Sequence, residues 1–459
     1  MEYRKEHDSM GQVLVPADRY WGAQTQRSLD NFKIGARMPL ALIHAFGGLK
    51  LAAARVNAQL NPARMSAEKC AVIEAAAREV MDGVLDEHFP LVVFQTGSGT
   101  QTNMNANEVI ANRANELAGA TLVHPNDDVN MAQSSNDTFP TAMHLAAVCE
   151  GERTLLPALD RLIGELLRLE AENAGIVKSG RTHLQDATPI GFSQEISGWR
   201  ASLERDRAAI LSGLDALRPL AIGGTAVGTG LNAPKGFGDA MAAALSALFG
   251  TAFSSDANKF SALTSLSPFV TAHAALKALA ADLFKMANDI RLMASGPRCG
   301  LYEITIPENE PGSSIMPGKV NPTQCEAITM VACAVMGNDT TIGMAASQGH
   351  FELNVFLPVT ANAFLGSLSL LSEAMDSFRL HCVGGIRPNR EQMERNLYGS
   401  LMTATALSPH IGYERTAELV KLAHREGLTL REAALRLGVL SAEEFDALYH
   451  PENMIGGTL

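Results

Sequence analysis

The feature that most constrains the fold of this chain is a helical spacing of apolar residues over most of its length. Five long stretches carry an apolar residue at every third or fourth position: 39–59, 66–87, 139–173, 192–217 and 266–295. Runs of alternating β-branched residues are short and rare, and only Val13-Leu14-Val15 is a candidate strand. The pattern therefore predicts a mainly α fold, built as a bundle of long helices.

One further helical stretch, from Ala327 to Phe351, is unusually poor in charge. Asp339 is its only Asp, Glu, Lys or Arg, whereas a helix on a protein surface needs a polar face. A central core helix of one large subunit would explain this composition. We favour a helix buried by other subunits, because bundles of this length commonly complete their cores by symmetric association.

The C-terminal part of the chain has a different character. After Pro388 the predicted helices are short, and two begin with capping boxes, formed by Thr429 with Glu432 and by Ser441 with Glu444. A polar loop at 124–138 marks the end of the N-terminal part. We therefore expect three domains, at 1–134, 135–390 and 391–459.

The net charge of the chain limits the classes of partner that it is expected to bind. The 459 residues include 37 Lys and Arg against 49 Asp and Glu, a net charge of -12. An acidic chain repels phosphate backbones and anionic lipid, so neither nucleic acid nor a membrane is an expected partner. No uncharged apolar run approaches the ~20 residues that span a bilayer, and the mixed-charge N-terminus is unlike a signal peptide. We expect a cytoplasmic protein.

The cysteines and histidines are not spaced as they are in known metal-binding motifs. The six cysteines include no C-x-x-C pair, and the twelve histidines match no zinc motif. Cys325 and Cys333, the closest two cysteines, lie in an apolar stretch and are expected to be buried free thiols. Neither a metal nor a cofactor is expected.

Two polar stretches in the N-terminal third each adjoin an apolar helix, the kind of position where a rigid scaffold carries active-site residues. Residues 95–105 offer neutral donors and backbone N–H groups ahead of a helix, which suits a carboxylate. A tight turn with a serine cap is the alternative. In the second stretch, residues 124–137, three consecutive donors at 134–136 exceed what one helix cap requires, although capping alone would explain some of them.

Two more polar stretches lie further along the chain. In residues 180–189, His183 is expected in a polar loop between two helices, where a catalytic and a structural role are equally plausible. Residues 308–322 contain three Pro and two Gly and are predicted to form a loop. This loop is not a Walker A motif, because five residues rather than four separate Gly312 from Gly318 and a Val follows the Lys. An ordinary surface loop is the alternative. The glycine-rich run at 223–230 follows a helix and is interpreted as a structural turn.

Together, these stretches resemble the fumarase/aspartase superfamily of helical lyases, and specifically the metal-independent class II fumarases. The run Gly312-Ser313-Ser314-Ile315-Met316-Pro317-Gly318-Lys319-Val320-Asn321-Pro322 is the specific signature, and the other stretches match in order and spacing from about Asp8 to the C-terminus. The resemblance implies a three-domain helical lyase, a homotetramer with a central multi-helix core, and active sites that each combine three chains. It also implies a dicarboxylate substrate without metal or cofactor.

Three positions separate this chain from aspartases within the superfamily. It has His183 where aspartases typically carry Gln, Ser135 where they carry Thr, and Gly318 where they usually have Ala. The implied activity is the fumarate hydratase reaction of the tricarboxylic acid cycle, the reversible anti-elimination of water from (S)-malate. Aspartate ammonia-lyase and a non-enzymatic structural oligomer are the two alternatives.

The resemblance further implies roles for individual residues. Ser313 is the base, with its anion stabilised by Lys319 and backbone N–H groups, and His183, paired with Glu326, manages the proton on the hydroxyl side; which of the two groups is base and which is acid stays open. The implied substrate-binding residues are Ser98, Gly99, Thr100, Ser134, Ser135, Asn136, Thr182, Ser314, Lys319, Val320 and Asn321. His124, Pro125, Asn126 and Asp127 match a secondary anion site, for which a simple helix start is the alternative.

Overall fold

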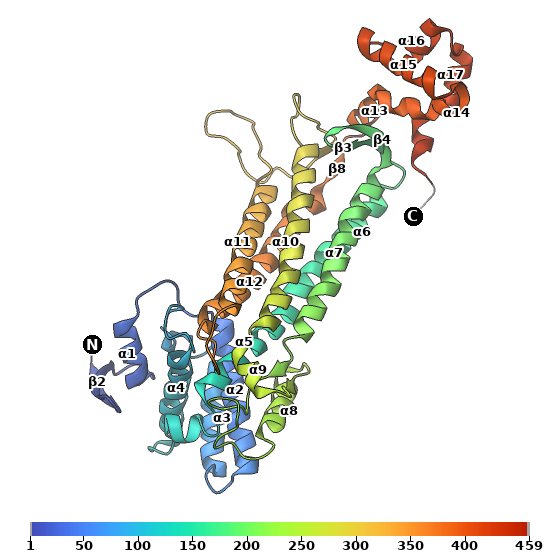
Figure 1. The fold of residues 1–459 in the computed structure, drawn as a ribbon. Coiled ribbons are helices and arrows are strands. Elements are labelled where there is room, and N and C mark those ends of the chain that lie inside the picture. Colours follow the sequence, from blue (N-terminus) through green and yellow to red (C-terminus); the bar gives the residue numbers. More distant parts are fainter. Residues whose placement is uncertain (1, 457–459) are drawn as a thin grey trace. The chain divides into compact units, whose positions relative to one another are not determined.

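The computed structural model describes residues 2–456 and confirms a mainly α fold built from long helices (Figure 1). Met1 and residues 457–459, at the outer ends of the first and third predicted domains, lie outside the described residues. Across residues 2–456, no helix combines the length and the apolar character needed to cross a membrane.

Helices make up most of the chain, and short strands lie between some of them. The α-helices are α1 (Ala23–Asn31), α2 (Leu40–Leu60), α3 (Ala67–Met81), α4 (Thr100–Ala118), α5 (Ser135–Glu150), α6 (Leu156–Glu172), α7 (Phe192–Asp215), α8 (Phe237–Phe249), α9 (Lys259–Thr264), α10 (Ser267–Met293), α11 (Thr323–Ala346), α12 (Leu357–His381), α13 (Arg390–Gly399), α14 (Ser408–Ile411), α15 (Tyr413–Glu426), α16 (Leu430–Leu437) and α17 (Ala442–Leu448). Short 3-10 or π-helical turns are η1 (Asp86–His88), η2 (Pro125–Val129), η3 (Gly151–Leu155), η4 (Val383–Gly385), η5 (Leu401–Leu407) and η6 (Pro451–Met454). The strands are β1 (Tyr3–Asp8), β2 (Gly11–Pro16), β3 (Val177–Thr182), β4 (Gln185–Gly191), β5 (Pro219–Leu220), β6 (Ser254–Ser255), β7 (Ile304–Thr305) and β8 (Arg387–Pro388).

The predicted long helices are present, with shifted ends. The stretch predicted at 139–173 begins four residues earlier, because Ser134 and Asp137 form a capping box that starts α5 at Ser135. The stretch predicted at 66–87 ends early, at Met81, and Gly83 then adopts a φ of 78° that a helix cannot continue. The predicted capping boxes at Thr429 and Ser441 start α16 and α17.

The strands correct two expectations. Val13-Leu14-Val15 does lie in a strand, but its antiparallel partner β1 is a run of polar residues that carries no apolar alternation. The loop expected at 180–189 is wrong: β3 and β4 form an antiparallel hairpin, and His183 and Leu184 make its two-residue turn with φ values of 57° and 60°. Two left-handed residues match the twist of a tight hairpin turn.

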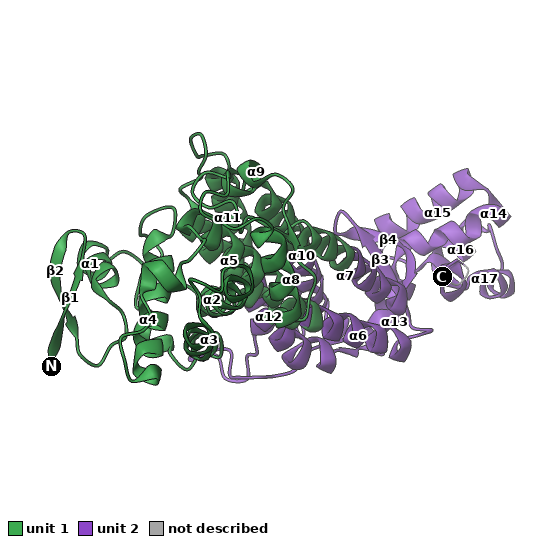
Figure 2. Ribbon diagram, turned by 90° about the horizontal axis from the view of Figure 1, so that it is seen from below, with its two compact units in different colours: residues 1–157, 206–280, 331–372 green, residues 158–205, 281–330, 373–459 purple. Residues whose placement is uncertain are grey.

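The chain divides into two compact units, each assembled from three segments (Figure 2). Unit 1 is Met1–Pro157, Asp206–Ala280 and Val331–Ser372, and unit 2 is Ala158–Arg205, Ala281–Met330 and Glu373–Leu459. The three-domain division expected from sequence stays a prediction. In unit 1, α2 packs against α3, α5 and α8; in unit 2, the short C-terminal helices enclose an apolar cluster that includes Leu407, Leu419 and Phe445.

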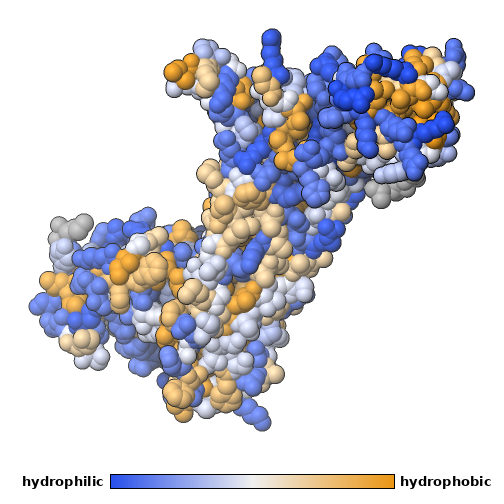
Figure 3. Space-filling view, turned by 45° about the horizontal axis from the view of Figure 1, so that its top comes forward, coloured by the Kyte–Doolittle hydropathy of each residue, from blue (hydrophilic) through white to orange (hydrophobic). Residues whose placement is uncertain are grey.

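Helix α11 exposes an uncharged face. Its exposed residues from Ala327 to Met344 are small or apolar, Met330 among them at 67% exposed. Figure 3 shows a region of white and tan surface, with few blue atoms, over the long helices. Cys333, which was expected to be buried, is exposed on this face of the single chain. Cys325 is buried beside Cys382, with a Sγ–Sγ distance of 3.9 Å.

Candidate active site

The first group of predicted site residues begins α4 in unit 1. Gly99 is the N-cap and has a φ of 71°, and a Cβ there would lie 2.0 Å from the Phe139 ring, so a side chain at this position would clash. Ser98 and Thr100 share a hydrogen bond of 2.8 Å between their hydroxyl oxygens. Thr100 also borders a cavity of about 260 Å³ in unit 1. Hydroxyl groups therefore lie at the positive end of a helix, where an anion is favoured.

The second group begins α5, in the same unit. Ser134 is the N-cap: its Oγ accepts the Asn136 N–H at 3.3 Å, and its own N–H donates to Asp137 Oδ1 at 2.8 Å. The capping interpretation thus holds for Ser134. The side chain of Ser135 takes no part in the cap, and its Oγ instead accepts a 3.0 Å hydrogen bond from Asn103 Nδ2. Asn103 lies in the first turn of α4, so it joins the two groups of predicted residues.

The glycine-rich run after β5 is anchored to this helix start. Asp137 Oδ2 accepts the N–H groups of Gly223 at 3.0 Å and Thr225 at 2.8 Å, and Asn136 Nδ2 donates to Ala226 O at 2.8 Å. Burial raises the pKa of Asp137 to about 6, against the opposing effect of its backbone hydrogen bonds. The run therefore forms a turn, as predicted, and supports the loop that carries Ser134, Ser135 and Asn136.

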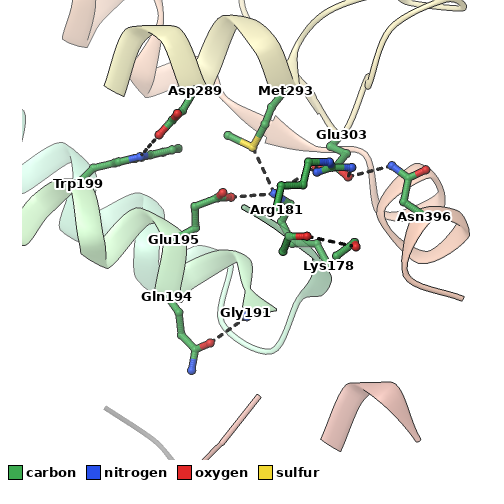
Figure 4. Close-up of polar contacts among 12 residues, drawn as sticks. Lys178, Arg181, Gly191, Gln194, Glu195, Trp199, Asp289, Met293, Glu303 and Asn396 are labelled. Carbon is green, nitrogen blue, oxygen red and sulfur yellow. Dashed lines mark hydrogen bonds and ion pairs between the residues drawn. The ribbon is translucent and has the colours of Figure 1, made fainter. Parts of the chain in front are cut away.

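The hairpin β3–β4 carries Thr182 and His183 at its exposed end, in unit 2. The same hairpin takes part in what we call the buried ionic cluster, formed by Lys178, Arg181, Glu195 and Glu303 (Figure 4), in which Lys178 and Glu303 are buried and the other two are partly exposed. Lys178 Nζ lies 2.9 Å from Glu195 Oε2 and 3.1 Å from Glu303 Oε2.

Glu303 is the centre of the buried ionic cluster. Arg181 donates to both of its oxygens, at 2.7 and 2.9 Å, and Asn396 of α13 donates to Oε1 at 2.8 Å. Burial alone would raise the pKa of Glu303, but the hydrogen bond from Arg181 and the charge of Lys178 together hold it below its usual value. Arg181, the strand residue directly before Thr182 and His183, is therefore held in place by the buried, ion-paired carboxylate of Glu303.

The signature loop lies between β7 and α11 and confirms the predicted absence of helix there. The Gly312 N–H donates to Lys319 O at 2.7 Å, and Asn321 Nδ2 donates to Gly312 O at 2.7 Å, which closes the loop on itself. Ser313 Oγ accepts two backbone N–H groups, from Ile315 at 3.3 Å and from Met316 at 3.1 Å. Such donors favour a negative charge on that oxygen.

Five predicted residues of unit 2 remain unpartnered. No side-chain hydrogen bond or ion pair within residues 2–456 involves the exposed residues Thr182, His183, Ser314, Lys319 and Glu326. In particular, His183 contacts neither Ser313 nor Glu326 through such a bond. Val320 is also exposed. Unit 1 therefore brings its predicted residues together, whereas unit 2 presents its own on the hairpin, on the signature loop and in the first turn of α11.

The predicted secondary anion site lies at the start of η2. His124 is the N-cap, and its Nδ1 accepts the N–H groups of Asn126 at 3.3 Å and Asp127 at 3.2 Å, with Pro125 in the first turn. His124 Nδ1 also lies 3.4 Å from Asp127 Oδ2. The helix-start interpretation is therefore sufficient for this geometry, and an anion-binding role stays a prediction.

Two residues of this region were missed by the sequence interpretation. Asn103 lay within the first polar stretch but was not singled out, and neither was Lys50, which donates a hydrogen bond to it and lies in the helical stretch predicted at 39–59. The sequence around Lys50 could have indicated that it is buried, because Lys50 is the only Asp, Glu, Lys or Arg between Leu40 and Ala54. No group of three or more His, Cys, Asp or Glu in the described part of the chain could hold a metal ion.

Comparison with known proteins identifies the family. A lyase family model matches residues 11–337, and a model described as the fumarase C C-terminus matches residues 404–456. The chain is 58% identical to the class II fumarate hydratases of Bacillus subtilis and of Helicobacter pylori, over 99% of each chain. A crystal structure of class II fumarase from Schistosoma mansoni superimposes with a TM-score of 0.96 at 43% identity, covering 99% of both chains. The chain therefore belongs to the fumarase/aspartase lyases, in the class II fumarate hydratase branch.

Proposed function

We propose that this chain catalyses the reversible anti-elimination of water from (S)-malate to give fumarate. The observation that carries this proposal is the signature loop, in which Ser313 Oγ accepts the N–H groups of Ile315 and Met316 while the Lys319 ammonium has no partner in the described chain. A neutral serine is too weak a base for carbon acids. Two backbone donors, together with the Lys319 ammonium of the same loop, would stabilise the Ser313 anion.

Removal of the malate C3 proton places charge on the neighbouring carboxylate, which becomes an aci-carboxylate dianion. Preorganised donors aimed at this charge supply a large share of the barrier reduction, each worth about 3 kcal/mol by analogy with an oxyanion-hole donor. Lys319 and Asn321 of the signature loop, with Thr100 and the donors at 134–136, form a set suited to two carboxylates. A local set of this kind would offset the net charge of -12.

His183 is the proposed general acid on the hydroxyl side, with Glu326 as its partner. The turn that holds His183 is fixed through the neighbouring strand by Arg181 and Glu303, so the imidazole would be carried on a rigid support. Both His183 and Glu326 are exposed and have no side-chain hydrogen bond in the described chain. They are therefore free to accept partners from outside it.

These unpartnered residues support a second part of the proposal, that the active protein is a homotetramer whose sites each combine several subunits. The exposed face of α11 has no charged residue from Ala327 to Met344, and Phe351, beyond its end, is 92% exposed. Large uncharged surfaces of this kind are typical of subunit interfaces. A cytoplasmic location and a place in the tricarboxylic acid cycle belong to the same proposal, as does a secondary anion site at His124.

The test is a spectrophotometric assay of fumarate absorbance with purified protein, first with (S)-malate and then with aspartate. We expect absorbance to rise with malate and to stay flat with aspartate. A rise with aspartate alone would assign ammonia-lyase activity, and no rise with either substrate would favour a structural oligomer. Sedimentation equilibrium tests the assembly, and a mass equal to that of one chain would contradict the shared sites.

A further inference from the structure

Lys50 of α2 is a buried cation that the proposed mechanism does not use. Its side chain is 0% exposed, and its ammonium donates to three neutral oxygens: Asn103 Oδ1 at 2.8 Å, Gln133 Oε1 at 2.9 Å and Asn130 Oδ1 at 3.1 Å. We call these three residues the amide cage. All three ammonium hydrogens are satisfied, yet no residue in the cage neutralises the charge.

Buried lysines are nearly always paired with a carboxylate. Within residues 2–456 no carboxylate lies within ion-pair distance of Lys50, and Asp137 is the one titratable group whose charge acts on it. Asp137 is itself engaged by the N–H groups of Ser134, Gly223 and Thr225. Of the charged groups on α3, which packs against α2, Lys69 is paired with Asp128 at 2.7 Å, Glu74 with Arg55 at 2.8 Å and Glu79 with Arg113 at 2.7 Å.

The amide cage leads directly to the residues proposed to bind substrate. Asn103 lies in the same helical turn as Thr100, and Gln133 precedes Ser134 in the chain. The N-termini of α4 and α5 add positive partial charge to this region. The protonated form of Lys50 thus places a positive charge behind two helix starts, in a chain whose overall charge repels anions.

The cage also fixes the direction of a hydrogen bond. Asn103 Oδ1 accepts from Lys50 and, at 3.0 Å, from Thr138 Oγ1, so its amide cannot flip without losing both bonds. Asn103 Nδ2 must therefore donate, and Ser135 Oγ accepts from it at 3.0 Å. The Ser135 hydroxyl hydrogen has no acceptor in the described chain, so it is left free to donate to a ligand oxygen.

We propose that Lys50 is a positioning residue and the buried cation of the substrate-binding site, where it attracts a substrate carboxylate and orients Asn103 so that the Ser135 hydroxyl donates to it. This inference rests on the proposed function, since it concerns the same dicarboxylate. Burial lowers the pKa of Lys50 to about 7, so part of the population is neutral at that pH and an anion bound nearby favours the protonated form. Substrate binding then takes up a proton.

The first experiment is a kinetic comparison of the full-length wild type with Lys50→Met. The substrate carries both carboxylates before and during the reaction, so loss of the cation weakens ground state and transition state alike. We expect KM for malate to rise about 10- to 100-fold with a much smaller change in kcat. Lys69→Met, which removes a partly buried lysine outside the site, is the matched control and should leave KM unchanged.

A second variant tests the charge with Lys50 still in place. Gln133→Glu keeps an acceptor oxygen in the amide cage but gives the ammonium a carboxylate partner, which cancels the field. We expect KM to rise as in Lys50→Met. An unchanged KM in folded Gln133→Glu would overturn the electrostatic role.

The third experiment needs no stable variant. Calorimetric titration of the wild type with succinate, a non-reacting dicarboxylate, in two buffers of different ionisation enthalpy gives the protons taken up on binding. We expect uptake of up to about 0.5 protons per site near pH 7, because half of the Lys50 ammonium is then deprotonated in the free protein. Succinate binding without uptake between pH 6 and pH 8 would overturn the proposal.

Variants identify the group that takes up the proton. Uptake that persists in His183→Asn and disappears in Lys50→Met supports the proposal, whereas uptake that persists in Lys50→Met overturns it. A wild type without malate turnover would instead remove the proposed function. Active wild type with an unaltered KM in Lys50→Met would remove only the role of Lys50.

Discussion

Each unit buries a cluster of charged side chains next to proposed site residues, and the two clusters differ in charge balance. In unit 2, the buried ionic cluster contains two cations and two carboxylates, joined by three ion pairs of 2.7–3.1 Å. In unit 1, Lys50 is surrounded by the neutral amide cage, with Asp137 acting on it only through its charge. One cluster is balanced by direct contacts between opposite charges, whereas the protonated form of Lys50 contacts only neutral oxygens and is unbalanced in that sense.

The difference indicates two ways of building a site. A balanced cluster presents no strong field to a ligand, but its many fixed hydrogen bonds hold a strand in one geometry. An unbalanced cluster is costly to bury, and an anionic ligand recovers part of that cost. We interpret the first as the support of the His183 turn and the second as part of the substrate site.

The largest expected effect comes from the groups that move protons. Ser313→Ala and His183→Asn should each lower kcat by about 10²- to 10⁴-fold, because each removes a group that transfers a proton in the transition state. Steady-state malate assays, with circular dichroism to verify folding, measure this. Near-normal turnover in both variants would contradict the catalytic roles of Ser313 and His183. The balanced cluster would then not be the support of a catalytic residue.

Removing the centre of the balanced cluster should mainly cost stability. Glu303→Gln leaves Lys178 and Arg181 close together without their shared carboxylate, and breaking a buried ion pair in this way costs about 3–5 kcal/mol. Urea unfolding measures the loss, and kcat should fall as the His183 turn loosens. Glu195→Gln is the matched control: Glu195 is 26% exposed and contacts only one of the cations, so the loss should be smaller. Equal losses would mean that Glu303 is not the centre of the cluster.

The unbalanced cluster predicts an unusual pH dependence of stability. The pKa of Lys50 is about 7 in the folded protein, below its unfolded value of ~10.4, so the unfolded chain binds this proton more tightly between pH 7 and pH 10. The contribution of Lys50 to the free energy of unfolding therefore rises with pH across that window, by at most about 1.4 kcal/mol per pH unit. Urea midpoints of the wild type and Lys50→Met isolate this contribution. A difference between them that stays constant from pH 7 to pH 10 would contradict the lowered pKa.

Local sequence patterns predicted the helices but not the clusters. The long helices follow from apolar spacing, and the starts of α16 and α17 follow from capping boxes only four residues long. The β3–β4 hairpin was missed because the buried positions of β3 are polar. Lys178 and Arg181 of this strand are stabilised by Glu303, more than 120 residues later in the chain. Partners at such separations leave no periodic signal.

The same limit applies to the site. The signature loop is one continuous run of residues, and so are the donors at 134–136, so the resemblance could identify both. The structure places the donors at 134–136 beside α4. Lys50 depends on amide groups 53, 80 and 83 residues away, and nothing in its own neighbourhood predicts a cage. His183 differs from Lys50, because the described residues of one chain form no side-chain hydrogen bond with it, including the expected partner Glu326.

The smallest expected effects come from two helix caps of the same form, one in each unit. Ser134 and Ser441 both begin helices with a capping box, but the acidic partner of Ser134 is the buried Asp137, whereas that of Ser441 is the exposed Glu444. Ser441→Ala should cost about 1 kcal/mol of unfolding free energy, the usual value of a lost cap, and leave KM and kcat unchanged.

Ser134→Ala should cost a similar amount of stability and should also raise KM for malate, because its cap holds the loop that carries Ser135 and Asn136 next to the Lys50 cage. Urea midpoints together with malate kinetics on both variants make the comparison. If Ser134→Ala changed stability alone, as Ser441→Ala is expected to do, the start of α5 would be an ordinary helix start. The charge of protonated Lys50 would then have to act through Asn103 and α4.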